Sequence, residues 1–243
     1  MPTNLRVVSY NIHKGIGGTD RLYRIERVQA VLNDLQPDLV LLQEVDEGVP
    51  RSHRDRQVHL LAKGLGMTHQ AYQKNVRLKQ GHYGNAILSR FPLKSIESID
   101  LTVRPKKRRR ALVARCRVDV DHHFRSLLVV NLHLGLAGLE RKMQLKRLLS
   151  KHPLARASSR IPIILGGDYN DFYGNLGRSM MFRQGFASAG KAIRTFPAVL
   201  PVRSLDRIFY RGPLKLRHAF AKRTQLARQA SDHLPLVADF ELS

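Results

Sequence analysis

Four short apolar runs in this sequence end in amide, carboxylate or imidazole side chains, and this feature limits the fold more than any other. Apolar runs of about four to eight residues between turn-forming residues are typical of buried strands. Ligand crevices in α/β proteins form at strand ends, so we expect these polar groups to belong to one site. In chain order, the runs end in Asn11, in Gln43 and Glu44, in Asn131 and His133, and in Asp168, Asn170 and Asp171.

Two further runs carry their polar groups at the start. Asp206 precedes one of them, and Asp232 and His233 precede the other. If these two strands run antiparallel to the other four, all six polar groups meet at one edge of the sheets. Asp or Asn after a strand is otherwise common turn chemistry, and Asp168 with Asn170 fits a turn as well as a site. The coincidence of all the groups favours a site.

The remaining pattern predicts an α/β chain with a single domain over residues 1–243. Between Leu22 and Leu35 the apolar residues recur on one half of a helical wheel, which predicts an amphipathic helix. No repeat period and no Ser/Gly-rich linker divides the chain. The basic run at residues 104–110 is either a disordered arm or a loop. We favour the loop because an apolar strand pattern follows at residues 111–118.

The chain carries 42 Lys and Arg against 19 Asp and Glu, a formal net charge of +23. With 43% hydrophobic residues its composition is globular, so the excess charge lies on a folded surface. Such a surface attracts nucleic acid, anionic phospholipid or a phosphorylated small molecule. The single cysteine, Cys116, excludes an intramolecular disulfide. We expect no signal peptide and no transmembrane segment, which predicts a cytoplasmic protein.

The donors at the predicted strand ends are oxygens and imidazole nitrogens, without any thiolate. Oxygen ligands suit Mg²⁺, with Mn²⁺ as the alternative ion, and argue against a cysteine-type zinc site. Glu44 stands out because a carboxylate that closes an apolar run is costly to bury unless it is paired or binds a metal. The sequence contains no P-loop, dinucleotide fingerprint or serine-hydrolase elbow. These features predict metal-assisted hydrolysis of phosphate esters.

Seven short motifs follow one another along the chain. They are Ser-Tyr-Asn-Ile-His-Lys-Gly at 9–15, Leu-Leu-Gln-Glu-Val at 41–45, Tyr-Gly-Asn-Ala-Ile-Leu-Ser-Arg at 83–90, Asn-Leu-His at 131–133, Gly-Asp-Tyr-Asn at 167–170, Leu-Asp-Arg-Ile at 205–208 and Ser-Asp-His at 231–233. As an ordered set they resemble the deoxyribonuclease I-like endonuclease/exonuclease/phosphatase family, and most of all its compact bacterial members. The resemblance runs from about residue 5 to residue 241. It implies a four-layer α/β/β/α sandwich in which helices flank two packed mixed sheets.

The resemblance also implies which residues hold the metal and the water. Glu44 would be the main Mg²⁺ ligand, with Asn11 and Asp232 supporting the metal or its waters. Asp168 and Asn170 would orient the attacking water and the phosphate. These roles are carried over because each residue stands at the matching position of its motif.

Three further residues would act on the phosphate itself. His233, oriented by Asp206, would contact the scissile phosphate, while His133 would lie near the leaving group as a candidate acid. Either Asp168 or His233 would take the proton from water, and the resemblance does not choose between them. Both are therefore kept as candidate bases.

The sequence departs from one branch of the family at residue 13. His13 stands where the abasic-site endonucleases have an aspartate, which argues against a second metal and against that particular activity. His82, which precedes the predicted strand that contains Asn85, and Asn85 itself are candidate substrate contacts, with a surface-loop role as the alternative.

The predicted function is divalent-metal-dependent hydrolysis of phosphodiester or phosphomonoester bonds by a nuclease that acts on DNA or RNA. The alternative keeps the chemistry but takes phospholipid or inositol-phosphate head groups as substrates, because anionic membranes attract the same basic surface. A non-catalytic binding protein is disfavoured because the acidic residues and both histidines of the motifs are all present.

Overall fold

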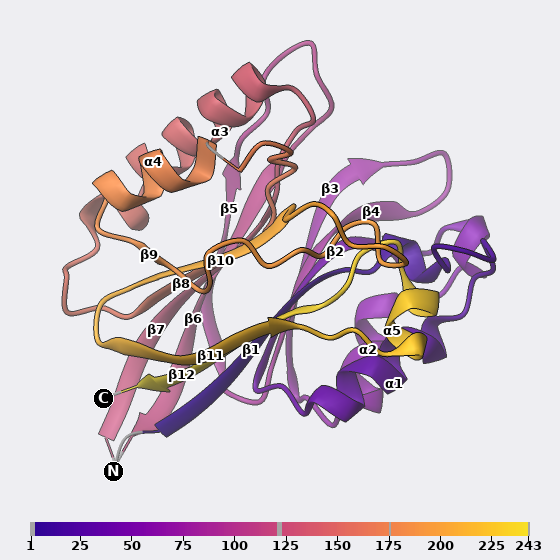
Figure 1. Ribbon diagram of the computed structural model, residues 1–243, viewed down its shortest axis with the longest axis horizontal. Coiled ribbons are helices and arrows are strands. Elements are labelled where there is room, and N and C mark those ends of the chain that lie inside the picture. Colours follow the sequence, from indigo (N-terminus) through magenta and orange to yellow (C-terminus); the bar gives the residue numbers. More distant parts are fainter. Residues whose placement is uncertain (1–2, 121–122, 175, 243) are drawn as a thin grey trace.

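The computed structural model describes residues 3–120, 123–174 and 176–242, and in it the chain forms two six-stranded sheets that pack face to face. Helices cover the outer face of each sheet (Figure 1). The predicted four-layer α/β/β/α sandwich is therefore confirmed.

The first sheet contains β1 (Thr3–Asn11), β2 (Leu39–Glu47), β3 (His69–Arg77), β4 (His82–Ser89), β11 (Leu214–Ala221) and β12 (Leu236–Leu242). Their order across the sheet is β11-β12-β1-β2-β4-β3. The central strands β1 and β2 are parallel, and β12 runs antiparallel to β1 on its other side.

The second sheet contains β5 (Leu93–Asp100), β6 (Arg110–Val120), β7 (His123–His133), β8 (Ile163–Asp168), β9 (Ala187–Ser188) and β10 (Asp206–Arg211). Their order is β5-β6-β7-β8-β10-β9. Here β7 and β8 are parallel, and β10 runs antiparallel to β8. The basic run lies in the loop between β5 and β6, as predicted.

The helices divide between the two outer faces, with α1, α2 and α5 on the first sheet and α3 and α4 on the second. Over the residues that the structure describes, no helix is both long and apolar enough to cross a membrane. The helix bounds are α1 Ile25–Leu35, α2 Gln57–Gly64, α3 Gly138–Ser150, α4 Leu176–Arg183 and α5 Gln225–Ala230, with short 3₁₀ turns η1 His13–Gly15, η2 Pro50–Ser52 and η3 Leu154–Arg156.

The central strands are buried on both faces, which explains their nearly continuous apolar sequences. Because side chains alternate along a strand, Val8 of β1 faces the helices on its own sheet, whereas Val7 faces the second sheet. Val7 packs in one cluster with Val129 of β7 and Ile164 of β8. Burial of apolar area of this kind contributes roughly 25 cal/mol per Å² and holds the two sheets together.

The predicted convergence of strand ends is confirmed. In the first sheet Asn11 is level with Gln43, and in the second sheet Asp168 is level with both His133 and Asp206. The antiparallel directions of β10 and β12 bring the starts of these strands to the edge where the parallel strands end. This is the edge that positions the site.

Two predicted element starts were wrong. The first helix begins at Ile25 rather than Leu22, because Tyr23 forms a β-bridge with Ile16 and keeps the preceding backbone extended. Leu22 is consequently exposed. The last strand, predicted from the apolar run that starts at Leu234, begins at Leu236, so His233 lies in the segment before it.

Buried amides join the two sheets below the site. From β7, the Asn131 amide donates hydrogen bonds to the carbonyl oxygens of Leu42 and Ala86 in the first sheet, both at 2.8 Å. Its Oδ1 atom accepts a hydrogen bond from Gln43 at 2.8 Å. One side chain therefore satisfies polar groups of two strands in the opposite sheet.

We predict that Asn131→Ala lowers the free energy of unfolding by about 3 kcal/mol or more, because it removes the side-chain donor of two buried carbonyls and one acceptor of the buried Gln43 amide. Urea unfolding followed by circular dichroism measures the change. Asn4→Ala on the exposed part of β1 is the matched control and should change stability by less than about 0.5 kcal/mol. A loss of similar size in both variants would contradict the role of the amide.

Candidate active site

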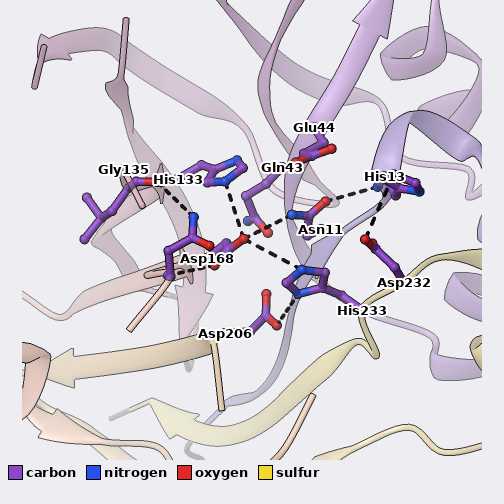
Figure 2. Close-up of polar contacts among 12 residues, drawn as sticks. Asn11, His13, Gln43, Glu44, His133, Gly135, Asp168, Asp206, Asp232 and His233 are labelled. Carbon is purple, nitrogen blue, oxygen red and sulfur yellow. Dashed lines mark hydrogen bonds and ion pairs between the residues drawn. The ribbon is translucent and has the colours of Figure 1, made fainter. Parts of the chain in front are cut away.

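Asp168, the last residue of β8, lies at the centre of the polar cluster (Figure 2). Its Oδ2 atom accepts a hydrogen bond from the Asn11 amide at 3.1 Å. The same oxygen lies 3.4 Å from Nε2 of His133 and 3.9 Å from Nε2 of His233. The backbone N–H of Asn170 donates to the other oxygen at 2.8 Å. Groups from both sheets thus converge on one buried carboxylate.

His233 is fixed from its far side by Asp206. Nδ1 of His233 donates to Oδ2 of Asp206 at 2.8 Å, and the Thr195 hydroxyl donates to the same oxygen at 2.6 Å. The ring of Phe196 packs against the imidazole with 4.9 Å between ring centroids. The structure thus brings Asp206 and His233 together as the resemblance implied, and it leaves Nε2 of His233 directed toward Asp168 (Figure 2).

Glu44 is directed into the site by a β-bulge. The pairing of β2 with β4 shifts register between Leu42 and Val45, and Glu44 adopts a left-handed backbone with φ of 58°. An extra residue in a strand redirects the side chains beside it. The Glu44 carboxylate pairs with the ammonium group of Lys14 and accepts a hydrogen bond from the Tyr83 hydroxyl.

Lys14 reaches Glu44 from a strained turn at the end of β1. His13 and Lys14 have φ values of 45° and 64°, a region that non-glycine residues seldom occupy. The Gln57 side chain donates a 2.7 Å hydrogen bond to the Lys14 carbonyl oxygen and holds the turn in place. Strain retained beside buried polar groups is typical of functional sites.

Asn11 and Asp232 take different positions around this turn. Oδ1 of Asn11 accepts a hydrogen bond from the His13 N–H at 3.1 Å, while the Asn11 amide bonds Asp168. Asp232 is a third exposed, and its carboxylate lies 4.0 Å from Nε2 of His13. Asn11 therefore belongs to the buried centre, and Asp232 lies at its outer side.

Asn170 stands two residues after Asp168 in a left-handed conformation with φ of 48°. Its side-chain amide donates a 3.0 Å hydrogen bond to the carbonyl oxygen of Leu134, just beyond His133. The residue thus ties the ends of β7 and β8 together.

The two candidate substrate contacts on β4 differ in their surroundings. Asn85 is buried and donates a 3.3 Å hydrogen bond to the Arg110 carbonyl oxygen in the opposite sheet. No hydrogen bond or ion pair joins His82 to the cluster within residues 3–120, 123–174 and 176–242. Tyr83 reaches Glu44 instead, since neighbouring side chains of a strand point to opposite faces.

Four residues near the site were missed by sequence reasoning: Lys14, Tyr83, Arg109 and Thr195. Lys14 and Tyr83 lie inside motifs that were recognised, yet a motif does not show where its neighbouring side chains point, and Thr195 lies outside the seven motifs. Arg109 was hidden within the basic run, and only the folded loop shows that its charge acts on His133.

The two histidines beside Asp168 differ in charge. Burial lowers the pKa of His133 to about 4, with a further lowering by Arg109, so this ring is neutral near pH 7. Burial also opposes the charged form of His233, but Asp206 and then Asp168 outweigh it and raise its pKa to about 10. Burial raises the pKa of Asp168 itself, although the adjacent histidines oppose this.

The donor set around Glu44 fits Mg²⁺ or Mn²⁺. Burial alone would raise the pKa of Glu44, but the charges of His133, when protonated, and of Lys14 lower it to about 2. The carboxylate is therefore ionised and already holds a cation, the Lys14 ammonium. In the described part of the chain, no three His, Cys, Asp or Glu side chains form a complete metal cage. Mg²⁺ needs no such cage, because it commonly takes one or two carboxylates together with waters and substrate phosphate.

Comparison with known proteins identifies the class to which this site belongs. The sequence model of the Endonuclease/Exonuclease/phosphatase family matches residues 8–233. The chain belongs to this family, whose members are phosphoesterase hydrolases that generally use divalent metal ions. Among its relatives is the Escherichia coli K12 protein named "Uncharacterized protein YbhP", which is 29% identical over 252 residues, 98% of this chain and 97% of the relative.

Solved structures share the fold. An endonuclease/exonuclease/phosphatase from Beutenbergia cavernae aligns over 99% of this chain and 72% of its own, with 24% identity and a TM-score of 0.81. ANGEL2, described as a 2′,3′-cyclic phosphatase, aligns over 99% and 96% with 18% identity and a TM-score of 0.76. TDP2 from Caenorhabditis elegans aligns over 98% and 97% with 20% identity and a TM-score of 0.71.

The raised pKa of His233 makes a prediction about stability. In the unfolded chain the ring loses its proton near its ordinary pKa of 6.5, whereas in the folded protein it keeps the proton up to about pH 10. The contribution of this proton to the free energy of unfolding is therefore complete below pH 6.5. It declines as the pH rises toward 10, by at most about 1.4 kcal/mol per pH unit.

Asp206→Asn should flatten this decline, because it removes the charge that holds the proton. Urea unfolding of both proteins at several pH values between about 7 and 8.5 measures the slope. The range stops below the ordinary pKa of the Cys116 thiol, 9.0, at which the unfolded chain releases that proton, whereas burial raises the pKa of the folded thiol to about 12. A wild-type slope in Asp206→Asn would contradict the pairing.

Proposed function

We propose that this protein hydrolyses phosphoric esters in a reaction that depends on Mg²⁺ or Mn²⁺. The observation that carries the proposal is the buried Asp168, an acceptor that lies between one charged and one neutral histidine beside an ionised Glu44. These are the groups that water activation and phosphate stabilisation require.

Glu44 would be the main metal ligand. Asn11, level with Gln43 on the adjacent strand, would support the metal or its waters, and Asp232 would do so from the outer side of the site. A divalent ion bound here neutralises charge on a phosphoryl oxygen. The Lys14 ammonium would remain close to the phosphate that enters.

Asp168 is the better candidate for the base that takes a proton from the attacking water. A carboxylate whose pKa is raised by burial accepts a proton more readily than an ordinary aspartate. His233 already holds its proton near pH 7, so it cannot accept another. The Asn170 N–H and the Asn11 amide, which both donate to Asp168, would keep the carboxylate aimed at the water.

His233 would act as a fixed positive donor to the phosphate. Asp206 and Thr195 hold its ring, so little reorganisation is needed when negative charge develops. His133 is neutral in the free protein and would donate a hydrogen bond on the leaving-group side. His133 can act as an acid only when it is protonated, so the bound phosphate would have to raise the pKa of its ring. Asn85, and His82 from the hairpin end, would contact more distant parts of the substrate.

Nucleic acid is the first candidate substrate because the charge of +23 favours a polyanion with many phosphodiesters. Phosphatase activity is supported by ANGEL2, which is described as a 2′,3′-cyclic phosphatase. Phospholipid or inositol phosphate is the second candidate, because an anionic membrane attracts the same basic surface. A chain with one buried thiol fits the reducing cytoplasm, where we propose that the enzyme works.

A panel of substrates tests the activity. The protein is incubated with Mg²⁺ or Mn²⁺ and supercoiled DNA, abasic duplex, RNA, inositol phosphates, phospholipids or the soluble diester bis(p-nitrophenyl) phosphate. Glu44→Ala is the blank. Absence of metal-dependent hydrolysis from every substrate would overturn the proposal.

The assigned roles predict different defects in two variants. Glu44→Ala should lower the rate and raise the Mg²⁺ concentration at half-maximal rate, by roughly tenfold or more. His233→Ala should lower the rate by about 100-fold or more and leave the Mg²⁺ dependence unchanged. Steady-state kinetics with a Mg²⁺ titration measures both values.

Glu97→Ala on β5 and His123→Ala at the start of β7 are matched controls, because the Glu97 side chain is 41% exposed and His123 is exposed. Both should behave as the wild type. An equal loss of Mg²⁺ affinity in Glu44→Ala and His233→Ala would show that the two roles are assigned wrongly.

A further inference from the structure

The most exposed large apolar side chains lie on loops and on the first turn of α3 at the catalytic edge. Among the described residues, four such side chains are more than 60% exposed: Leu136 at 69%, Leu139 at 73%, Tyr173 at 86% and Leu200 at 71%. We call these four residues the apolar rim. Large apolar side chains gathered on one edge mark an interaction surface more often than singly scattered ones do.

The three loops that carry the rim start from adjacent strands of the second sheet. The first follows His133, the second follows Asp168 and the third precedes Asp206. Backbone hydrogen bonds join the loops where they meet the strands. The Leu134 N–H donates to the Asp168 carbonyl oxygen, and the Tyr169 N–H donates to the Leu205 carbonyl oxygen, both at 2.9 Å. The rim residues therefore lie around one site and do not belong to separate faces.

The second and third loops also enclose a groove of about 250 Å³ next to the rim. Phe172 and Tyr173 line one side of the groove, and Arg194, Val202 and Arg203 line the other. The Arg203 guanidinium lies 4.6 Å from the centre of the Phe172 ring. Apolar and cationic groups thus alternate on the surface beside the reacting centre.

Two loops around the rim carry positive charge without acidic residues. Residues 190–205 contain Lys191, Arg194 and Arg203 but no Asp or Glu. The loop at residues 101–109 contains the exposed Lys106, Lys107 and Arg108 and is likewise free of acidic residues. A hydrogen bond of 2.6 Å from Arg147 of α3 to the Thr102 carbonyl oxygen holds this loop beside α3, as Figure 1 also shows.

We propose that the apolar rim and the surrounding cations form a docking surface for an anionic lipid membrane. Three of the four rim residues are leucines, which can neither stack on a base nor bond a phosphate, whereas they gain free energy at the acyl boundary of a bilayer. Lysine and arginine beside them are attracted to anionic head groups. A nucleic acid would use the cations and leave the leucines in water.

Docking in this way directs the catalytic edge toward the lipid surface. Asp168 ends β8, the strand from which the second of these loops starts, and Nε2 of His233 lies 3.9 Å from its carboxylate. Of the two candidate substrate classes, the surface favours phosphate esters located at a membrane. The docking itself requires no hydrolysis, so it can be tested separately from the proposed reaction.

Co-sedimentation with vesicles tests the proposal. Wild-type protein is mixed with vesicles of phosphatidylcholine alone or of phosphatidylcholine with phosphatidylglycerol, at low and at high salt. We expect binding to the anionic vesicles that falls by about tenfold or more on neutral vesicles or when salt is raised. The triple variant Leu136→Ser, Leu139→Ser, Leu200→Ser should lose about tenfold or more of the binding to anionic vesicles at low salt.

The matched control is the double variant Ile96→Ser, Phe124→Ser, in which two exposed apolar side chains away from the catalytic edge are changed. It should bind vesicles as the wild type does. Thermal melting confirms that both variants remain folded. Equal vesicle binding by the triple variant and the wild type would overturn the proposal.

Two further outcomes would overturn it in favour of another occupant. One is absence of vesicle binding together with duplex DNA binding that the triple variant loses. The other is a wild-type dimer, measured by size-exclusion chromatography with light scattering, that the triple variant converts to monomer while no vesicle binds. Hydrolysis of bis(p-nitrophenyl) phosphate is measured in parallel and should be unchanged in the triple variant. Vesicle binding without any hydrolysis would refute the proposed reaction and leave the docking surface intact.

Discussion

The buried Asp168 carboxylate is the group on which the rest of the site depends. A carboxylate withdrawn from water is stable only when hydrogen bonds and charges surround it. Here the Asn11 amide and His233 reach it from the first sheet and its loops, and the Asn170 N–H and His133 reach it from the second. The packing of one sheet on the other is therefore also what completes the site.

Two histidines at similar distances from Asp168 end in opposite protonation states because their outer neighbours differ. His233 has a second carboxylate, Asp206, at 2.8 Å and keeps its proton. His133 is fully buried and faces the charge of Arg109, so it loses its proton easily. An acceptor, a charged donor and a neutral donor are thus arranged in one cluster, and acid–base chemistry on a phosphate requires such a separation of pKa values.

The surface around this cluster combines an excess of positive charge with exposed leucines. The excess of Lys and Arg alone would suit any polyanion, and the charge count does not distinguish one from another. The exposed leucines of the apolar rim narrow the choice, since aliphatic groups next to cations match a lipid surface better than a sugar–phosphate backbone. The composition shows the net charge, whereas the folded loops place exposed leucines beside the cations.

The sequence by itself determined the strands, the fold class and the polar residues at the strand ends, because apolar periodicity and local turn chemistry are short-range properties. The family resemblance also implied that Asp206 orients His233. The sequence did not determine that a bulge turns Glu44 toward Lys14, that Tyr83 rather than His82 reaches Glu44, or which histidine is charged. Only the tertiary structure decided these features, since they depend on distances between residues that are far apart in the chain and on the loss of water between two packed sheets.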